Sequence, residues 1–222
     1  MRKIILIAQV TLDGVVQGPG GPDEDTSGGF SHGGWAMAVE DPAIEQDLNA
    51  LMARDFDLLL GRRTYEIWTA YWPYHTDNPV GAAFEKATKY VATSTLETLD
   101  WGKAERISGD VAKEIRKLKE SDGPELHIWG SFKLVQTLVA EGLIDEFRLW
   151  VYPIIIGEGK RLFEKGVPPA AFKLTESHQT PKGLMINVYH PNGELRLGNA
   201  QEQEPSELEL SRRKKHEEED AS

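Results

Sequence analysis

The sequence contains no cysteine, and this absence excludes several classes of protein at once. Without thiols there can be no disulfide scaffold, no thiolate nucleophile and no zinc site built on sulfur. The six histidines show neither H-x-H nor H-E-x-x-H spacing, so a zinc hydrolase is unsupported and no metal is expected. A chain without cysteine fits a reducing compartment, and we therefore expect it in the cytoplasm.

Long apolar runs and an excess of positive charge are also lacking. The longest apolar run near the start is residues 4–8, which is too short for a membrane span or a secretory signal. Lys and Arg number 25 against 36 Asp and Glu, which gives a formal net charge of -11 at pH 7. Because such a chain repels polyanions, neither nucleic acid nor an anionic membrane surface is expected as a partner.

The length of 222 residues suffices for one large domain. We place this domain at residues 1–197 and a charged, flexible tail at residues 198–222. The tail carries eight acidic and four basic side chains, and its only large apolar residues are Leu208 and Leu210. Such a segment buries too little apolar surface to fold alone. We expect at most a transient charged helix there, around residues 207–215.

Short apolar runs alternate with segments of helical periodicity through the first two thirds of the chain. Strands are predicted at residues 3–10, 57–60, 89–93, 125–129 and 146–156, and later at 172–176 and 184–189. Helices are predicted at residues 44–52, 111–118 and 132–139, with Asp110 as an N-cap and Gly142 as a helix end. This alternation predicts an α/β fold in which helices cover both faces of a sheet, with an antiparallel edge near the C-terminus.

Glycine, hydroxyl or basic residues follow three of the predicted strands. The groups are Gly61, Arg62, Arg63 and Thr64; Thr93, Ser94 and Thr95; and Gly130 with Ser131. In the first and third groups the glycine lies between a strand and a helix start, where backbone amides and the helix dipole favour an anion such as phosphate. Two adjacent arginines suit the 2′-phosphate of NADP, although surface charges on a first helical turn would look the same.

Three carboxylates lie near this presumed pocket and are candidate proton donors. They are Asp13, just past the first strand, and Glu45 and Asp47, on the first predicted helix. Each also has an ordinary structural explanation, because Asp-Gly is a turn signature and acidic residues are favoured in the opening turns of a helix. Residues 17–34 hold seven glycines and two prolines, and we predict a long loop there, of the kind that is often functional.

Taken in order, these motifs resemble the dihydrofolate reductase superfamily. The resemblance rests on residues 11–14 (TLDG), 60–66 (LGRRTYE), 89–96 (KYVATSTL) and 128–131 (IWGS), and above all on 142–146 (GLIDE) and 153–163 (PIIIGEGKRLF). Within the superfamily, the chain is similar to stand-alone proteins that resemble the C-terminal reductase domain of the bifunctional riboflavin-biosynthesis deaminase-reductase. The resemblance spans about residues 2–190.

The resemblance implies a three-layer fold with a mostly parallel central sheet, and NADPH as the cofactor. By position, it implies that the phosphates are held by Gly61, Arg62, Arg63 and Thr64 and by the amides of Gly130, Ser131, Phe132 and Lys133. It places Ser94 and Thr95 beside the adenosine half, and Asp13 and Gly14 near the nicotinamide. Glu45 or Asp47 would stand where dihydrofolate reductase uses a helix carboxylate for its pterin. Trp35 is a candidate lid over the substrate, or alternatively an anchor for the long loop.

We therefore expect an NADPH-dependent reductase that acts on a small planar heterocycle, pteridine-like or aminopyrimidine-like. The proton would come from water or from Asp13 or Asp47. The chain lacks a deaminase domain and the Arg-x-Asp-Ala stretch that typically follows the first strand of the riboflavin enzymes, so a phosphoribosyl substrate is not implied. A homodimer is implied by family analogy, with the apolar stripe Phe147, Leu149 and Val151 as its candidate contact. The alternative is a non-catalytic NADP(H)-binding or sensing module whose tail contacts a partner.

Overall fold

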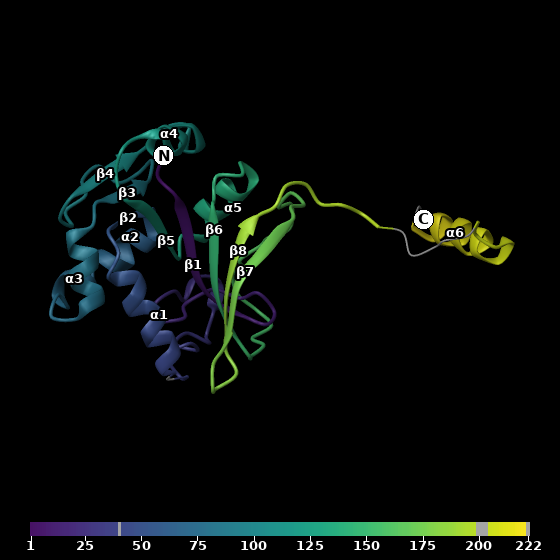
Figure 1. Ribbon diagram of the computed structural model, residues 1–222, viewed down its shortest axis with the longest axis horizontal. Coiled ribbons are helices and arrows are strands. Elements are labelled where there is room, and N and C mark those ends of the chain that lie inside the picture. The colour runs from purple at the N-terminus through teal and green to yellow at the C-terminus, as the bar shows by residue number, and fades with distance from the viewer. Residues whose placement is uncertain (40, 199–203, 221–222) are drawn as a thin grey trace.

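The computed structural model describes residues 1–39, 41–198 and 204–220, and in this part of the chain a single sheet of eight strands forms the core (Figure 1). The strands are β1 (Ile4–Thr11), β2 (Phe56–Gly61), β3 (Lys89–Ala92), β4 (Ala104–Ile107), β5 (Glu125–Trp129), β6 (Glu146–Tyr152), β7 (Phe172–Gln179) and β8 (Met185–Pro191). The helices are α1 (Pro42–Met52), α2 (Arg62–Thr69), α3 (Pro79–Lys86), α4 (Val111–Glu120), α5 (Phe132–Ala140) and α6 (Glu207–Asp220). Short 3-10 turns lie at Ser27–Gly29 and Trp72–Tyr74.

The sheet is mostly parallel and has an antiparallel edge, as the sequence predicts. Its order is β4-β3-β2-β5-β1-β6-β8-β7. The six strands from β4 to β6 pair in parallel, whereas β8 and β7 are antiparallel to their neighbours. Because these six strands run in the same direction, their carboxyl ends all lie at one edge of the sheet.

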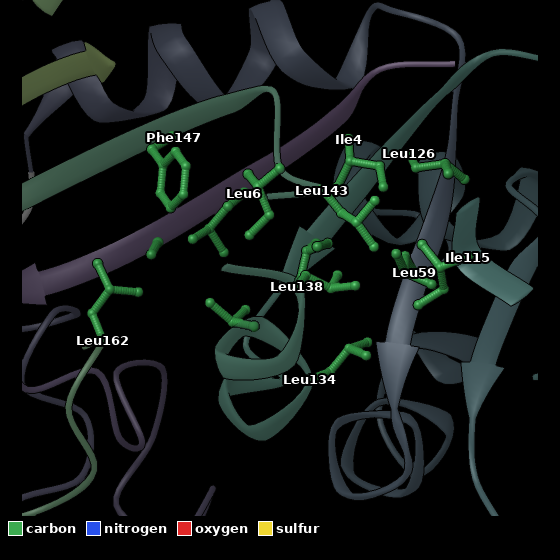
Figure 2. Packing of buried hydrophobic residues seen from close by; sticks show 14 of the residues in the cluster. Ile4, Leu6, Leu59, Ile115, Leu126, Leu134, Leu138, Leu143, Phe147 and Leu162 are labelled. Atoms are coloured by element: carbon green, nitrogen blue, oxygen red, sulfur yellow. The ribbon is translucent and has the colours of Figure 1, made fainter. Parts of the chain in front are cut away.

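Alternate residues of the central strands pack against different helices, which produces three layers. On β1, Ile4 and Leu6 face α4 and α5, and Figure 2 shows them packed around Leu138 and Leu143. Ile5 and Ile7 point to the opposite face, where α1 covers them. Each such fully buried aliphatic side chain stabilises the fold by about 1.5 to 3 kcal/mol. Strands buried on both faces are near-continuous apolar runs, which is why β1, β2 and β5 were predictable.

Several element boundaries differ from the sequence prediction for identifiable reasons. The strand predicted at residues 146–156 ends at Tyr152, because Pro153 has no amide hydrogen to continue the ladder. The strand β4 and the helix α3 were not predicted, and β4 presents mostly exposed or half-exposed side chains. The two predicted helix signals are confirmed: the Asp110 side chain accepts from the Lys113 amide at 3.0 Å, and Gly142 has a φ of 61° after α5.

The predicted tail contains a longer helix than the sequence suggested. The helix α6 has no buried residue and lies apart from the domain in Figure 1, and within it Glu209 pairs with Arg212 and Arg213. Exposed pairs at these spacings stabilise a helix that has no apolar face. Residues 199–203 and 221–222 of the predicted tail lie outside the described residues. None of the helices in the described ranges has the length and apolar character to span a bilayer.

A buried ion pair joins the amino ends of the parallel strands. Arg2 is 4% exposed and Asp57 is 8% exposed, and the two side chains are in direct contact. Arg2 also donates to the carbonyl of Pro124 at 2.7 Å, and the Asp57 carboxylate accepts from the Thr88 amide at 2.9 Å. The pair therefore connects β1, β2 and β5 at the end of the sheet away from the parallel strands' carboxyl ends.

We predict that Asp57→Ala lowers the free energy of unfolding by about 3 kcal/mol, because it leaves the Arg2 guanidinium buried without its counterion. The measurement is urea-induced unfolding followed by Trp fluorescence. The matched control is Asp55→Ala, which removes the exposed pair with Lys86 and leaves the unfolding midpoint unchanged. Equal effects of the two substitutions would contradict the prediction.

Candidate cofactor and substrate site

The ends of β2 and β5 are joined by hydrogen bonds between the first and third predicted motifs. The Gly61 amide donates to the Ser131 hydroxyl at 2.9 Å, and the Ser131 amide donates to the Thr64 hydroxyl at 2.9 Å. Gly130 has a φ of 59°, and a Cβ placed on it would lie 3.1 Å from the Thr64 hydroxyl oxygen. Ser131 itself adopts a φ of 57°, which is uncommon for a residue with a side chain. The structure thus brings these two motifs together.

Two helices begin at this junction, and neither is capped by a side chain. Gly61 is the N-cap of α2 and Ser131 is the N-cap of α5, and neither cap position makes a side-chain hydrogen bond to its helix. By contrast, Asp41 and Asn78 cap α1 and α3 with their side chains. The first-turn amides of α2 and α5 are therefore available to an anion at the positive ends of both helix dipoles. This donor set fits the phosphates of a dinucleotide.

The two adjacent arginines have different surroundings. Arg62 donates through one nitrogen to both carboxylate oxygens of Glu66, each at 2.8 Å. Arg63 is exposed and has no hydrogen-bond or ion-pair partner among the described residues. Lys133, in the first turn of α5, is also exposed. Arg63 and Lys133 are consequently the cations most available to an incoming phosphate.

The second predicted motif lies on the next strand of the same edge. In the parallel register Gly61 stands beside Ala92, and Ala92 stands beside Ile107. Ser94 and Thr95 follow in an exposed turn that the Thr93 hydroxyl stabilises by accepting the Thr95 and Leu96 amides, each at 3.2 Å.

One further cation belongs to this turn. Arg106 donates to the Leu96 carbonyl at 3.4 Å. Sequence reasoning missed Arg106, because it lies on the unpredicted strand β4 and no local motif marks it.

The structure gives Asp13 a role in holding a loop. Its carboxylate accepts from the Thr11 hydroxyl at 2.6 Å and from the Gly157 and Ile156 amides at 2.8 and 3.3 Å. The hydrogen bond from Thr11, followed by those from the two amides, lowers the pKa of Asp13 to about 2. A carboxyl with this pKa is ionised at neutral pH, and this disfavours its use as a general acid.

Gly14 completes the same turn. It has a φ of 83°, and its carbonyl accepts from the Leu162 amide at 2.9 Å. The residue therefore links the end of β1 to the segment after β6, and its backbone conformation is one that a glycine adopts without strain.

The two helix carboxylates on α1 point to different places. Asp47 accepts from Arg148 at 2.8 Å and from the Trp150 indole nitrogen at 2.7 Å, so both of its oxygens are already engaged with β6. Glu45 is exposed and has no side-chain partner in the described chain. Neither carboxylate is oriented by a contact toward the junction of β2 and β5.

Trp35 anchors the long glycine loop. It is 8% exposed, donates from its indole nitrogen to the Gln17 carbonyl at 2.8 Å, and packs edge-to-face against Tyr152. The Gln17 side chain donates to the carbonyls of Asp25 and Ser27, each at 2.9 Å. The loop is thus an ordered structure, and of the two explanations of Trp35 the geometry favours the anchor.

An aromatic wall lies between α1 and the carboxyl ends of β5 and β6. Trp129 and Trp150 approach within 5.8 Å between ring centroids, and Tyr152 continues the row on β6. The indole nitrogen of Trp129 is buried and has no hydrogen-bond partner in the described part of the chain. Such an atom is a candidate donor to a ligand. In the sequence, Trp129 stood out only as the residue before Gly130. Neither its burial nor the orientation of its indole nitrogen could be predicted from the sequence.

Among residues 1–39, 41–198 and 204–220, His, Asp and Glu side chains do not gather in any group of three that would suit a metal ion.

Comparisons with known proteins identify relatives across most of the chain. Residues 2–186 match the family described as RibD C-terminal domain. The uncharacterized protein YyaP of Bacillus subtilis (strain 168) is 30% identical over 196 residues, which cover 86% of this chain and 96% of that protein.

Two solved structures share the fold. A putative riboflavin biosynthesis protein from Shewanella sp. PV-4 has a TM-score of 0.66 at 24% identity, covering 86% of this chain and 99% of that one. The dihydrofolate reductase of Enterococcus faecalis, solved with NADP(H) and RAB-propyl, has a TM-score of 0.56 at 14% identity, covering 86% and 96%.

The loop-holding role of Asp13 predicts a specific pH dependence. Because its pKa in the folded protein, about 2, lies below the ordinary value of 3.8, the stability it contributes is present above pH 4 and is lost as the pH falls toward 2. We expect Asp13→Asn to be less stable than the parent at pH 6, and to lose less further stability between pH 4 and pH 2. Thermal unfolding across this range measures the difference, and parallel pH profiles would contradict the assignment.

Proposed function

Because the chain belongs to the RibD C-terminal domain family, we propose that it is an NADPH-dependent reductase of a small planar heterocycle, pteridine-like or aminopyrimidine-like. The observation that carries this proposal is the junction of β2 and β5, where two uncapped helix N-termini meet beside the free cations Arg63 and Lys133. The shared fold of a dihydrofolate reductase that was solved with NADP(H) supports the choice of cofactor. The absence of cysteine supports the cytoplasm as its compartment.

The order of the strands gives the cofactor a direction. The phosphate-binding junction lies at β2 and β5, and Ser94, Thr95 and Arg106 lie beyond β2, on the side of β3 and β4. We therefore assign the adenosine half to β3 and β4, with Arg63 at the 2′-phosphate. The nicotinamide half then extends past β5 toward β1 and β6. There Trp150 and Tyr152 are buried in the core, so the half-buried Trp129 is the ring of this row that remains available to a planar ligand.

The residues of the chain act mainly by binding and orientation. When bound, NADPH would supply a hydride to an electrophilic carbon of the heterocycle. The Trp129 indole nitrogen, which has no partner among the described residues, is our candidate donor to a ring carbonyl or nitrogen of the substrate. Since Asp13 is ionised and Asp47 is held by Arg148 and Trp150, we assign the proton that balances the reduction to water.

Asp13 and Asp47 are both held by hydrogen bonds within the protein, and this also favours a second candidate function. In it, the chain binds NADP(H) without oxidising it, and the charged helix α6 contacts a partner. Both candidates require NADPH binding, but only the reductase oxidises it. Absorbance at the NADPH band separates them: decay in the presence of a reducible pterin or pyrimidine supports the reductase. Binding with no decay across such a panel supports the module.

We also propose that two copies associate through the open face of β6, β8 and β7. Every residue of β7 is exposed, and Phe163, Phe172 and Leu174 are 46%, 37% and 48% exposed on this face. The paired rows across it contain no charged side chain: Phe147–Tyr189–Leu174, Leu149–Asn187–Ser177 and Val151–Met185–Gln179. A chain of net charge -11 meets a second copy with least repulsion through an uncharged surface. Phe147, the first residue of the predicted stripe Phe147, Leu149 and Val151, is only 3% exposed and therefore packs under the surface of this face.

The association proposal predicts that Leu174→Arg converts a dimer to a monomer, since it places a charge among the exposed apolar residues of this face. Light scattering after size exclusion, at micromolar protein, gives the mass of each species. The control is Lys173→Gln on the neighbouring position of β7, which faces the opposite side and keeps the dimer. A monomeric parent protein would refute the proposal.

The cofactor assignment predicts different roles for the two arginines. We expect Arg63→Ala to weaken NADPH binding about tenfold or more and NADH binding little, because it removes a charge-assisted contact to the 2′-phosphate. Arg62→Ala should have a smaller effect, since Glu66 already engages that guanidinium. Quenching of Trp fluorescence measures both affinities, and Arg116→Ala on α4 controls for the change in net charge. Equal losses for NADPH and NADH would overturn the assignment of Arg63.

A further inference from the structure

We propose that a water molecule is bound in the interior between α1 and the sheet, where it joins β5 to β6 through His127, Glu146 and Arg148. By completing the hydrogen bonds of Arg148, this water fixes the contact through which β6 holds α1. These three side chains have no part in the proposed reaction. The proposal therefore goes beyond the proposed function and does not depend on it.

The three side chains point toward α1 from the same face of the sheet. On β5, Leu126 packs on the face covered by α4 and α5, so the next residue, His127, points to the opposite face. On β6, Phe147 packs on the face of α4 and α5 as well, so its neighbours Glu146 and Arg148 also point toward α1. All three side chains therefore lie in the layer between the sheet and α1.

The strand register brings these residues close together. In the parallel pairing, Ile5 of β1 lies between His127 and Glu146, and Ile7 lies beside Arg148 in the next row. Two strand spacings separate the backbones of His127 and Glu146 by about 10 Å. Two side chains with one water between them can span such a distance, whereas a direct contact between the two side chains is not recorded.

Each of the three side chains has a buried polar atom without a hydrogen-bond partner among the described residues. These atoms are His127 Nδ1, Glu146 Oε1 and Arg148 Nε. The side chain of His127 is 0% exposed and that of Glu146 is 10% exposed, so bulk water does not reach them freely. Arg148 Nε lies 3.5 Å from Glu146 Oε1, which is longer than a typical N–H···O hydrogen bond. Since buried polar atoms are almost always paired with protein or with ordered water, we assign a water to this place.

The hydrogen-bonding character of the three atoms matches that of one water. Burial lowers the pKa of the His127 imidazole below its ordinary value of 6.5, although the Glu125 and Glu146 carboxylates oppose this shift, so the ring is mostly neutral at pH 7. His127 Nε2 lies 2.8 Å from Glu125 Oε1 and carries the ring hydrogen toward that carboxylate, which leaves Nδ1 as an acceptor. Glu146 Oε1 is a second acceptor, and Arg148 Nε is a donor. A water that donates twice and accepts once satisfies all three atoms, and buried waters typically make about three hydrogen bonds.

The water matters because Arg148 connects the sheet to α1. Arg148 donates to Asp47 of α1 at 2.8 Å, and the other Asp47 oxygen accepts from the Trp150 indole nitrogen at 2.7 Å. A further carboxylate, Glu176 of β7, lies 3.8 Å from the same guanidinium, but its side chain is 68% exposed. The water holds Arg148 Nε on the side of β5 and Glu146. The remaining nitrogens of the guanidinium are then fixed toward Asp47.

The test is a high-resolution crystal structure of the full chain, together with those of three variants. In the parent protein we expect one ordered water within hydrogen-bond distance of the three atoms. Glu146→Leu removes one acceptor, and His127→Phe removes the other while keeping a ring to stack on Phe56, so we expect both variants to lose the water. Glu176→Leu is the matched control: it removes a carboxylate near the same guanidinium from the solvent side, and it keeps the water.

Hydrogen exchange tests the consequence for α1. We expect the amides of α1 to exchange at least about tenfold faster in Glu146→Leu than in the parent protein, because the contact between Arg148 and Asp47 is then less firmly held. The same amides should exchange at the parent rate in Glu176→Leu. Mass spectrometry of peptides from residues 42–52 measures both rates.

A parent structure in which Arg148 bonds directly to Glu146, with no water between β5 and β6, would overturn the proposal even if neither buried variant folds. Persistence of the water in both Glu146→Leu and His127→Phe would also overturn it. Equal exchange of α1 in Glu146→Leu and Glu176→Leu would reject the role of the water in holding the helix. None of these results depends on NADPH, so titration with the cofactor tests the proposed function separately.

Discussion

The hydrogen-bonded junction between β2 and β5 is the constraint on which the candidate site depends. Gly61 donates to Ser131, and Ser131 donates to Thr64, so the two strand ends and the helices that follow them are fixed to one another. The left-handed backbone at Ser131 is the local cost of this arrangement. Its consequence is that the N-termini of α2 and α5 lie next to each other. Without this junction, the chain would present two unrelated helix ends in place of an anion site.

The junction also explains why positive charge gathers at one part of this sheet edge. Amides and helix dipoles attract anions at β2 and β5, and Arg63 and Lys133 add to that field. Beyond β5, the loops after β1 and β6 satisfy their own backbone amides with carboxylates such as Asp13, and pair their cations internally. The sheet edge therefore has available donors at β2 and β5, whereas the groups in the loops after β1 and β6 are engaged with one another.

The sequence predicted an element best where the residues that determine it lie close together in the chain. Apolar runs predicted β1, β2 and β5, and Asp110 was recognisable as a cap because its partner is three residues away. The glycine and arginine motifs were placed correctly at strand ends, since parallel strands bring such ends to one edge. The strand β4 escaped prediction because an edge strand needs few apolar residues. The role of Asp13 could not be foreseen, because its partner Gly157 lies 144 positions away in the chain.

The residues that looked most catalytic in sequence are those that the fold uses to hold its loops. Asp13 binds two amides of the segment after β6, Asp47 is shared by Arg148 and Trp150, and Trp35 anchors the glycine loop. A carboxylate that satisfies backbone amides gains stability from staying ionised, and this opposes its use as a proton donor. In a hydride transfer the cofactor carries the difficult chemistry, so the protein can succeed by orientation and charge alone. A reductase can therefore use these side chains to hold its loops, and water then supplies the proton to the substrate.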